Sequence, residues 1–106
     1  MPVIDLFPPE LRKVLPPLQG QEGVRDPIVY IKFLARNLGW TWYVTEGSPE
    51  DDEFIFFGFV VGDEMEWGQF SLSGLNGPFS PFNHFVQRDP DFKPMCLSEV
   101  LKRDYR

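Results

Sequence analysis

The sequence has one cysteine and one histidine, and it has no long apolar run. The single cysteine, Cys96, excludes an internal disulfide framework and a thiolate metal site, which favours a reducing compartment. The single histidine, His84, has no second histidine at ligand spacing, so we expect it to be structural. No stretch approaches about 18 consecutive apolar residues, and no basic segment precedes an apolar one at the N-terminus. We therefore expect a cytoplasmic protein that neither spans a membrane nor is exported.

Basic residues are missing from a long central part of the chain, between Arg36 and Arg88. The parts before and after residues 39–76 each hold five basic and four acidic residues, so the net charge of −6 arises in this region. Its eight acidic residues are Glu46, Glu50, Asp51, Asp52, Glu53, Asp63, Glu64 and Glu66. A negative field repels nucleic-acid phosphates and favours a basic partner, whereas a surface that only aids solubility is the alternative. Direct nucleic acid binding is not expected.

Motifs of known catalytic and cofactor sites are also missing. The sequence has no Gly-rich phosphate loop, no nucleophile elbow and no HExxH metal motif. The acidic residues near 47–52 and 62–64 fall at opposite ends of a predicted strand, about 30 Å apart, which is too far to share an ion. Cys96 precedes an apolar helix and is expected to pack as a small hydrophobic residue. The sequence therefore predicts no catalytic residue, no metal site and no cofactor.

Aromatic and β-branched residues are concentrated between positions 40 and 72, in a chain that is 42% hydrophobic and long enough for one domain over 1–106. Turn residues at 47–52 and 62–64 divide this region into three predicted antiparallel strands. These strands are 40–46, 53–61 and 66–72. Apolar side chains occur at both alternating positions of 53–61, so both faces of this strand must be buried and we expect it at the centre of the sheet.

Short helices are expected near both ends, at residues 8–15 and 97–103, where proline and charged residues suit helix termini. Residues 26–39 fit two structures. The spacing of their apolar residues favours a helix slightly, with Asp26 as its cap. Their β-branched and aromatic content, in contrast, fits a strand at 28–34. Residues 73–96 are rich in Gly, Pro, Ser and Asn and are predicted to be mostly loop.

Several short segments resemble a family of small proteins from bacterial plasmids, phages and other mobile elements that is known only as a domain of unknown function. The main segments are 40–46 (WTWYVTE), 56–58 (FFG) and 66–72 (EWGQFSL). Further matches are Pro9-Glu10-Leu11, Leu15-Pro16, Asp26-Pro27, Lys32-Phe33, Arg88-Asp89, Phe92-Lys93-Pro94 and Leu97-Ser98-Glu99. The sequence departs from the family at 73–75, where relatives continue into a helix-favouring Glu-Leu, so no helix is expected there.

The resemblance implies an α+β fold and implies that residues 28–34 form a strand, against the local helix pattern. We therefore expect an antiparallel sheet of about four strands, short N- and C-terminal helices and a loop-rich 73–96 segment. The strands are 28–34, 40–46, 53–61 and 66–72. The resemblance carries no activity that could be assigned to residues of this chain.

Two functions are consistent with these residues. The first is a non-enzymatic binding module that engages a host or element-encoded protein through its acidic sheet region. The second is a small-ligand-binding protein or an enzyme with a pocket rimmed by Lys32, Glu46, Glu66 and Arg88. Hydrogen bonds or ion pairs that fix strand edges are the alternative role for Glu46 and Glu66. The candidate binding residues are Lys32, Trp42, Glu46, Glu50, Asp51, Asp52, Glu66, Arg88 and Asp89.

The acidic region also suggests a variant of the first function, in which its carboxylates mimic the phosphates of DNA and counter a host defence protein. Such mimicry requires the carboxylates to lie on one accessible face at phosphate-like spacing. The predicted topology counts against this arrangement, because the two acidic turns lie at opposite ends of one strand.

Overall fold

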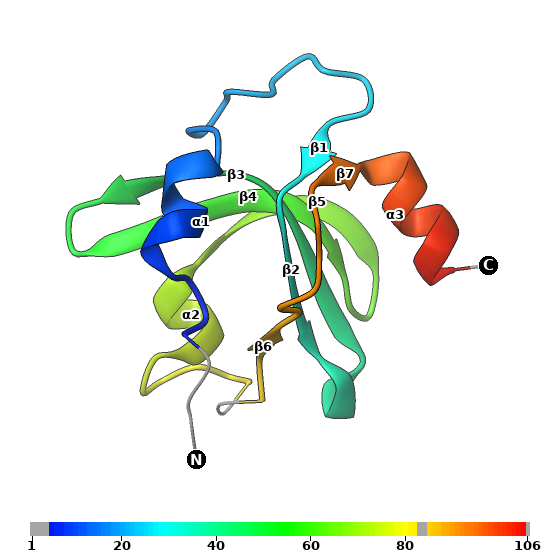
Figure 1. The fold of residues 1–106 in the computed structure, drawn as a ribbon. Helices are drawn as coiled ribbons and strands as arrows, with labels where there is room; N and C mark the ends of the chain where they lie inside the picture. Colours follow the sequence, from blue (N-terminus) through cyan, green and yellow to red (C-terminus); the bar gives the residue numbers. More distant parts are fainter. Residues whose placement is uncertain (1–4, 83–84, 106) are drawn as a thin grey trace.

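The computed structural model of the chain describes residues 5–82 and 85–105, so His84 lies outside the described residues. Within these residues, a five-stranded antiparallel sheet has the order β5-β4-β3-β2-β6 (Figure 1). Its strands are β2 (Ile31–Ala35), β3 (Trp40–Glu50), β4 (Glu53–Val61), β5 (Met65–Ser71) and β6 (Gln87–Arg88). A small second sheet pairs β1 (Ile28–Val29) with β7 (Met95–Cys96). Helices α1 (Pro9–Val14), α2 (Leu72–Asn76) and α3 (Leu97–Asp104) complete the α+β fold that the sequence predicts.

Both faces of the large sheet bury apolar side chains, as the apolar content of its strands requires. On the first face, Phe33 and Phe56 are fully buried and pack in one cluster with Leu75 of α2. On the second face, Tyr43 packs in a separate cluster with Val100 of α3. Helices α1 and α2 thus cover the first face, and α3 covers part of the second (Figure 1).

The predicted strand at 28–34 is confirmed, although it is divided between the two sheets. β1 pairs with β7, whereas β2 lies between β3 and β6. At the division, the N–H of Tyr30 donates to the carbonyl of Val44 at 2.9 Å. The helix that the local pattern favours at 26–39 is wrong, because long-range pairing with β3 overrides a weak local preference. Only a 3₁₀ turn forms there, at Arg36–Leu38.

Asp26 caps α3, and not the helix over 26–39 that the local sequence suggests. Its carboxylate accepts hydrogen bonds from the backbone N–H of Ser98 at 3.0 Å and from the Ser98 hydroxyl at 2.6 Å. Ser98 lies in the first turn of α3. The side chain of Cys96, the residue before this helix, makes no capping hydrogen bond. Asp26 therefore supplies the N-terminal cap of α3 from a segment distant in sequence.

β3 is longer than the predicted strand 40–46. The sequence predicts a turn over 47–52, but residues 47–50 pair with residues 53–56, and only Asp51 and Asp52 form the turn. Asp51 has a φ of 54°, a left-handed conformation that Asp adopts more readily than most residues. The register also shifts between Val44 and Glu46, where Thr45 is an extra residue in β3 and forms a β-bulge.

The second half of the sheet follows the prediction, with three corrections. β4 has the predicted bounds 53–61, but β6 adds a fifth strand, so that β3 is the middle strand. β5 ends at Ser71, one residue before the predicted end. The next residues form α2, not a loop, because the Ser71 hydroxyl caps this helix by accepting the N–H of Gly74 at 3.0 Å. In the described part of the chain, no helix is long and apolar enough to cross a membrane.

Candidate functional site

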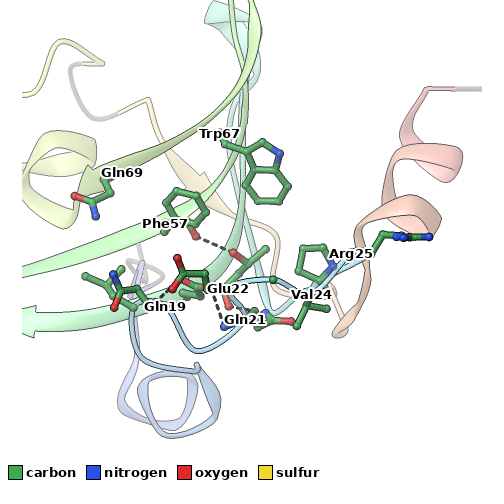
Figure 2. Close-up of a pocket in the computed structure, with 13 residues that line it drawn as sticks. Gln19, Gln21, Glu22, Val24, Arg25, Phe57, Trp67 and Gln69 are labelled. Atoms are coloured by element: carbon green, nitrogen blue, oxygen red, sulfur yellow. Dashed lines mark hydrogen bonds between the residues drawn. The ribbon is translucent and has the colours of Figure 1, made fainter.

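A cavity of about 500 Å³ opens on the second face of the sheet, and we call it the sheet-face hollow (Figure 2). One wall consists of Glu46 of β3, Phe57 of β4, and Trp67 and Gln69 of β5. The other wall is the loop between α1 and β1, which contributes most of residues 18–27. The hollow therefore combines a rigid sheet surface with a loop that must itself be held in place.

Glu46 reaches the hollow because of the bulge at Thr45. Side chains alternate between the two faces of a regular strand, so Glu46 would otherwise share the core face with Val44. The extra residue changes this order: Val44 pairs with Gly58, and Glu46 pairs with Phe57. Glu46 therefore lies on the same face as Phe57, and the hydroxyl of Thr45 donates to the Phe57 carbonyl at 3.2 Å.

The Glu46 carboxylate holds the loop against the sheet. Its side chain is buried, with the residue 5% exposed. One oxygen accepts the N–H of Gln19 at 2.7 Å, and the other accepts the N–H of Gln21 at 2.9 Å. Gln19 has a φ of 72°, which is uncommon for a residue with a side chain, and its hydrogen bond to Glu46 helps to maintain that conformation.

The Gln21 side chain adds a second attachment of the loop. Its amide nitrogen donates to the carbonyls of Ile28 and Thr45, both at 2.8 Å, and its amide oxygen accepts the N–H of Ile28 at 2.7 Å. The N–H of Leu18 also donates to the Ser48 hydroxyl at 2.9 Å. Because these bonds satisfy backbone groups of both the loop and the bulge, the loop is an ordered wall of the hollow.

Aromatic rings form the sheet side of the hollow. Phe57 and Trp67 are stacked, with ring centroids 5.6 Å apart and an interplanar angle of 11°. Phe59 meets Trp67 edge to face at 5.4 Å. Trp67 nevertheless remains 44% exposed. A large aromatic surface is thus fixed by its neighbours and still accessible to a ligand.

The charged residues of the hollow are Glu22, Arg25 and Glu46. The Arg25 side chain extends away from Phe57 and Glu22 (Figure 2). In the described part of the chain, the ion pairs are Lys32–Asp104 and Lys102–Glu99, so Glu46 has no basic side chain paired with it there. Two backbone N–H groups hold its carboxylate, and the lining of the hollow contains two acidic residues and one basic residue.

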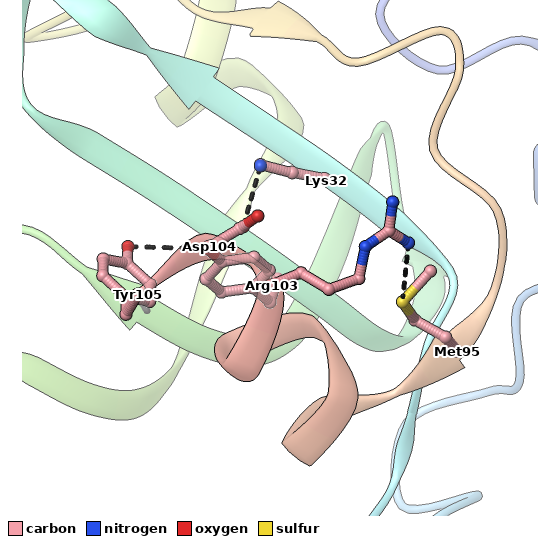
Figure 3. A network of polar contacts seen from close by, with 6 residues as sticks. Lys32, Met95, Arg103, Asp104 and Tyr105 are labelled. Atoms are coloured by element: carbon pink, nitrogen blue, oxygen red, sulfur yellow. Dashed lines mark hydrogen bonds and ion pairs between the residues drawn. The ribbon is translucent and has the colours of Figure 1, made fainter.

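A second hollow, of about 380 Å³, lies beside α3 and includes Lys32, Arg103 and Asp104 in its lining. Asp104 accepts a hydrogen bond from the Lys32 ammonium at 2.8 Å (Figure 3). It also accepts one from the Tyr43 hydroxyl at 2.6 Å. Burial acts to raise the pKa of Asp104, but these two donors hold it below its usual value. Burial, together with the bond to Asp104, raises the pKa of Tyr43 far above its usual value. This network attaches the end of α3 to β2 and β3.

Residues 6–103 match a family described as "Protein of unknown function (DUF2958)". The chain belongs to the DUF2958 family. The match includes every strand of both sheets and all but the last residue of α3. Comparisons with curated proteins and with solved structures gave no match. The sequence-based resemblance to an uncharacterised family is thus confirmed.

In this DUF2958 chain, the four residues predicted to rim one pocket are not brought together. Glu46 lines the sheet-face hollow, whereas Lys32 lines the second hollow. Arg88 donates through two guanidinium nitrogens to the carbonyl of Asp5, each at 3.3 Å. Glu66 is exposed on β5 and points to the other face from Trp67. The pocket predicted for these four residues therefore does not form. Pairing places Glu66 and Arg88 on the first face of the sheet, and Lys32 and Glu46 share the second face but line different hollows.

The other predicted binding residues are also dispersed. Trp42 is 2% exposed and packs in the core, where its ring lies 4.8 Å from that of Phe82. Asp89 lines the second hollow, and its N–H donates to the Lys32 carbonyl at 3.0 Å. Glu50, Asp51 and Asp52 are exposed at the β3–β4 turn, outside both hollows.

The acidic residues of positions 39–76 do not form one surface. Glu46 is buried. Glu53 accepts hydrogen bonds from the hydroxyl and the N–H of Ser73, and these bonds hold the pKa of Glu53 below its usual value. Asp63 and Glu64 lie at the opposite end of β4 from Asp51 and Asp52. Within residues 5–82 and 85–105, no three His, Cys, Asp or Glu side chains are placed to hold a metal ion.

The wall that the loop provides was not predicted from the sequence. Gln19 and Gln21 lie in a polar, Gly-flanked segment that has no regular periodicity, so nothing local indicates that their N–H groups bind Glu46. Phe57 and Trp67 were recognisable as strand residues, and their side of the sheet followed from alternation once the pairing was known. The one available signal was Glu46 itself, an acidic residue within an aromatic strand and away from a turn tip.

Proposed function

We propose that the chain is a non-enzymatic, cytoplasmic protein-binding module of a mobile element, and that its sheet-face hollow takes a cationic side chain from a partner protein. The observation that carries this proposal is the environment of Glu46. A buried carboxylate lies in the hollow without a basic side chain paired with it among the described residues. A lysine or arginine of a partner would supply the missing positive charge.

The aromatic wall favours the same class of ligand. The ring of an exposed tryptophan attracts a cation through its quadrupole, by about 0.5–1 kcal/mol at exposed sites and about 2 kcal/mol when water is excluded. Trp67 has such an exposed surface, and Glu22 and Glu46 provide acceptors in the same hollow. An aromatic surface beside carboxylates is suited to the alkyl chain and the charged end of lysine or arginine.

The charge distribution supports a protein partner with a basic surface. The absence of Lys and Arg between positions 36 and 88 makes the strands around the hollow an acidic region, which would steer a basic partner towards it. The dispersed carboxylates favour this local recognition over mimicry of a DNA backbone, which needs one continuous acidic face. A host defence protein would be a suitable basic partner for a mobile element, as the family resemblance suggests.

The proposal is tested with two capped peptides that alternate valine with lysine or valine with glutamine, hereafter the lysine peptide and the glutamine peptide. We expect the lysine peptide to bind, as measured by isothermal titration calorimetry, and the glutamine peptide to bind at least about tenfold more weakly. Equal affinities for the two peptides would exclude recognition of the cation.

Two matched variants locate the binding. Glu22→Gln removes an exposed carboxylate from the hollow, and Asp51→Asn removes one from the β3–β4 turn with the same change in net charge. Asn also tolerates the left-handed conformation of position 51. We expect Glu22→Gln to reduce the affinity for the lysine peptide severalfold and Asp51→Asn to change it little. The reverse result would place the cation at the turn and not in the hollow.

A further inference from the structure

The outer edge of β5 is an open strand edge. β5 forms one side of the large sheet and has seven residues, whereas β6, at the opposite side, has two. Proteins usually protect edge strands with short length, lysine, proline or a bulge. β5 has no lysine and no proline, and its register with β4 runs without interruption from Met65 to Ser71. β5 therefore lacks lysine, proline and a bulge, and Glu66 is the one charged residue in its sequence.

Other parts of the described chain leave this edge uncovered. Among the described residues, the backbone hydrogen bonds outside the regular elements involve none of residues 65–71. Every second residue of β5 directs its N–H and C=O away from β4, because the single β4–β5 ladder uses only alternate residues. Met65 and Trp67 are also 59% and 44% exposed. β5 thus offers unpaired backbone groups and accessible side chains along one line.

The open edge and the sheet-face hollow adjoin each other. Trp67 and Gln69 belong to β5 and line the hollow. A strand paired with β5 would lie about 4.8 Å from it, and alternate side chains of that strand would lie beside Trp67 and Gln69 on the same face. A single extended segment can therefore pair with the edge and direct a side chain to the hollow.

We propose that β5 is the docking strand for an extended segment of the partner protein, which adds to the sheet as a further strand and carries lysine or arginine at alternate positions. This inference rests on the proposed function and adds the mode of binding. Charge complementarity selects this occupant: Glu22 and Glu46 line the hollow beside Trp67, and Asp63 and Glu64 are exposed in the turn before β5. A second copy of the chain has no lysine or arginine between Arg36 and Arg88, so its own β5 edge would offer no complementary charge.

The test uses the lysine peptide and two derivatives that are N-methylated at alternate residues, one on all lysines and the other on all valines. In an added strand, one of these two sets directs its N–H groups to β5 and the other directs them to solvent. We expect one derivative to bind about tenfold or more weakly than the parent peptide and the other to bind within about threefold of it, because two or three hydrogen bonds are lost in only one case. Amide hydrogen exchange of residues 65–71 should slow when the parent peptide binds.

The possible outcomes separate the two proposals. If the lysine peptide binds but both derivatives bind equally well, or are weakened equally, the docking strand is wrong and the cation-binding hollow stands. If neither the lysine peptide nor its derivatives bind, both proposals are overturned. If residues 65–71 are already protected without peptide, in a way that depends on protein concentration, a second copy occupies the edge and the docking strand for a partner is wrong.

Discussion

Gln21 donates two hydrogen bonds to the β3 bulge at Thr45 and Glu46, one from its backbone and one from its side chain. The backbone N–H of Gln21 donates to the Glu46 carboxylate at 2.9 Å, and the side-chain amide of Gln21 donates to the carbonyl of Thr45, the residue before Glu46, at 2.8 Å. The loop between α1 and β1 is thus attached to the β3 bulge at a point where neither segment has regular pairing. The shape of the sheet-face hollow depends on this attachment.

Replacing Gln21 by Ala should reduce the free energy of unfolding by about 2–3 kcal/mol, because three bonded backbone groups of Ile28 and Thr45 lose their partner. The measurement is urea denaturation. Gln69→Ala is the matched control: it removes the same side chain from the other wall of the hollow, on an exposed position of β5, and should change stability by less than about 0.5 kcal/mol. Equal effects of the two substitutions would show that the amide of Gln21 does not hold the loop.

Replacing Phe56 by Ala should reduce the free energy of unfolding by about 3–5 kcal/mol, whereas Phe57→Ala should reduce it clearly less. Phe56 is 0% exposed, and its ring lies 4.9 Å from that of Phe7 in the core, whereas Phe57 is half-buried in the wall of the hollow. Thermal or urea denaturation of both variants gives the comparison. A loss below about 1 kcal/mol for Phe56→Ala would contradict the position of β4 inside the sheet.

Acid should destabilise the fold through three carboxyl groups, Asp26, Glu53 and Asp104. Side-chain and backbone hydrogen bonds from Ser98 lower the pKa of Asp26, those from Ser73 lower the pKa of Glu53, and the donors Lys32 and Tyr43 outweigh burial in lowering that of Asp104. A carboxyl pKa that is lower in the folded state stabilises the fold above the ordinary value of about 4, and this contribution is lost as the pH falls through the folded-state pKa. The free energy of unfolding should therefore decrease below about pH 4.

Asp104→Asn tests the network that attaches the end of α3 to the sheet. The variant should be less stable than the wild type at pH 7, and the difference should shrink below about pH 4, where Asp104 of the wild type becomes protonated. Tyr43→Phe removes one of the two donors to Asp104. The pKa of Asp104 should therefore rise, and the loss of stability in acid should begin at a slightly higher pH. A difference between Asp104→Asn and wild type that is constant with pH would contradict the lowered pKa.

The exposed acidic residues at the β3–β4 turn should not contribute to specific binding. Replacing Glu50, Asp51 and Asp52 together by Gln and Asn should leave the affinity for the lysine peptide within about threefold at moderate salt, because only long-range steering is lost. Calorimetric titrations across a salt series check this. A large loss of affinity, together with a reduced salt dependence, would support recognition by the acidic turn, as DNA mimicry requires.

The sheet could be predicted from the sequence where local pattern and tertiary pairing agree. In 53–61, apolar residues at both alternating positions indicate a strand buried on both faces, and β4 has these bounds. In 26–39, a helix-like spacing competes with β-branched content, and pairing of β2 with β3 and β6 decides the outcome. The extent of β3 could not be predicted, because the turn residues at 47–50 pair only after the Thr45 bulge has shifted the register.

The candidate site was only partly accessible to sequence analysis. Glu46 stood out as an acidic residue within an aromatic strand, and the structure places it in the hollow. Lys32, Glu66 and Arg88 were grouped with it by charge, but pairing and alternation put them in other places. Gln19 and Gln21 contribute through backbone N–H groups and a side-chain amide whose partners lie more than 20 residues away, at Thr45 and Glu46, so local sequence gives no indication of them.

The most direct test of the proposed function is a two-dimensional ¹H–¹⁵N spectrum of the labelled protein during titration with the lysine peptide. If the cationic side chain enters the sheet-face hollow, the largest shifts should be those of the Trp67 indole N–H and of the Gln19 and Gln21 amides, because the ring and the Glu46 carboxylate report directly on a nearby charge. The glutamine peptide should leave these signals in place. Shifts confined to the β3–β4 turn or to the second hollow beside α3, with Gln19, Gln21 and Trp67 unchanged, would contradict the account.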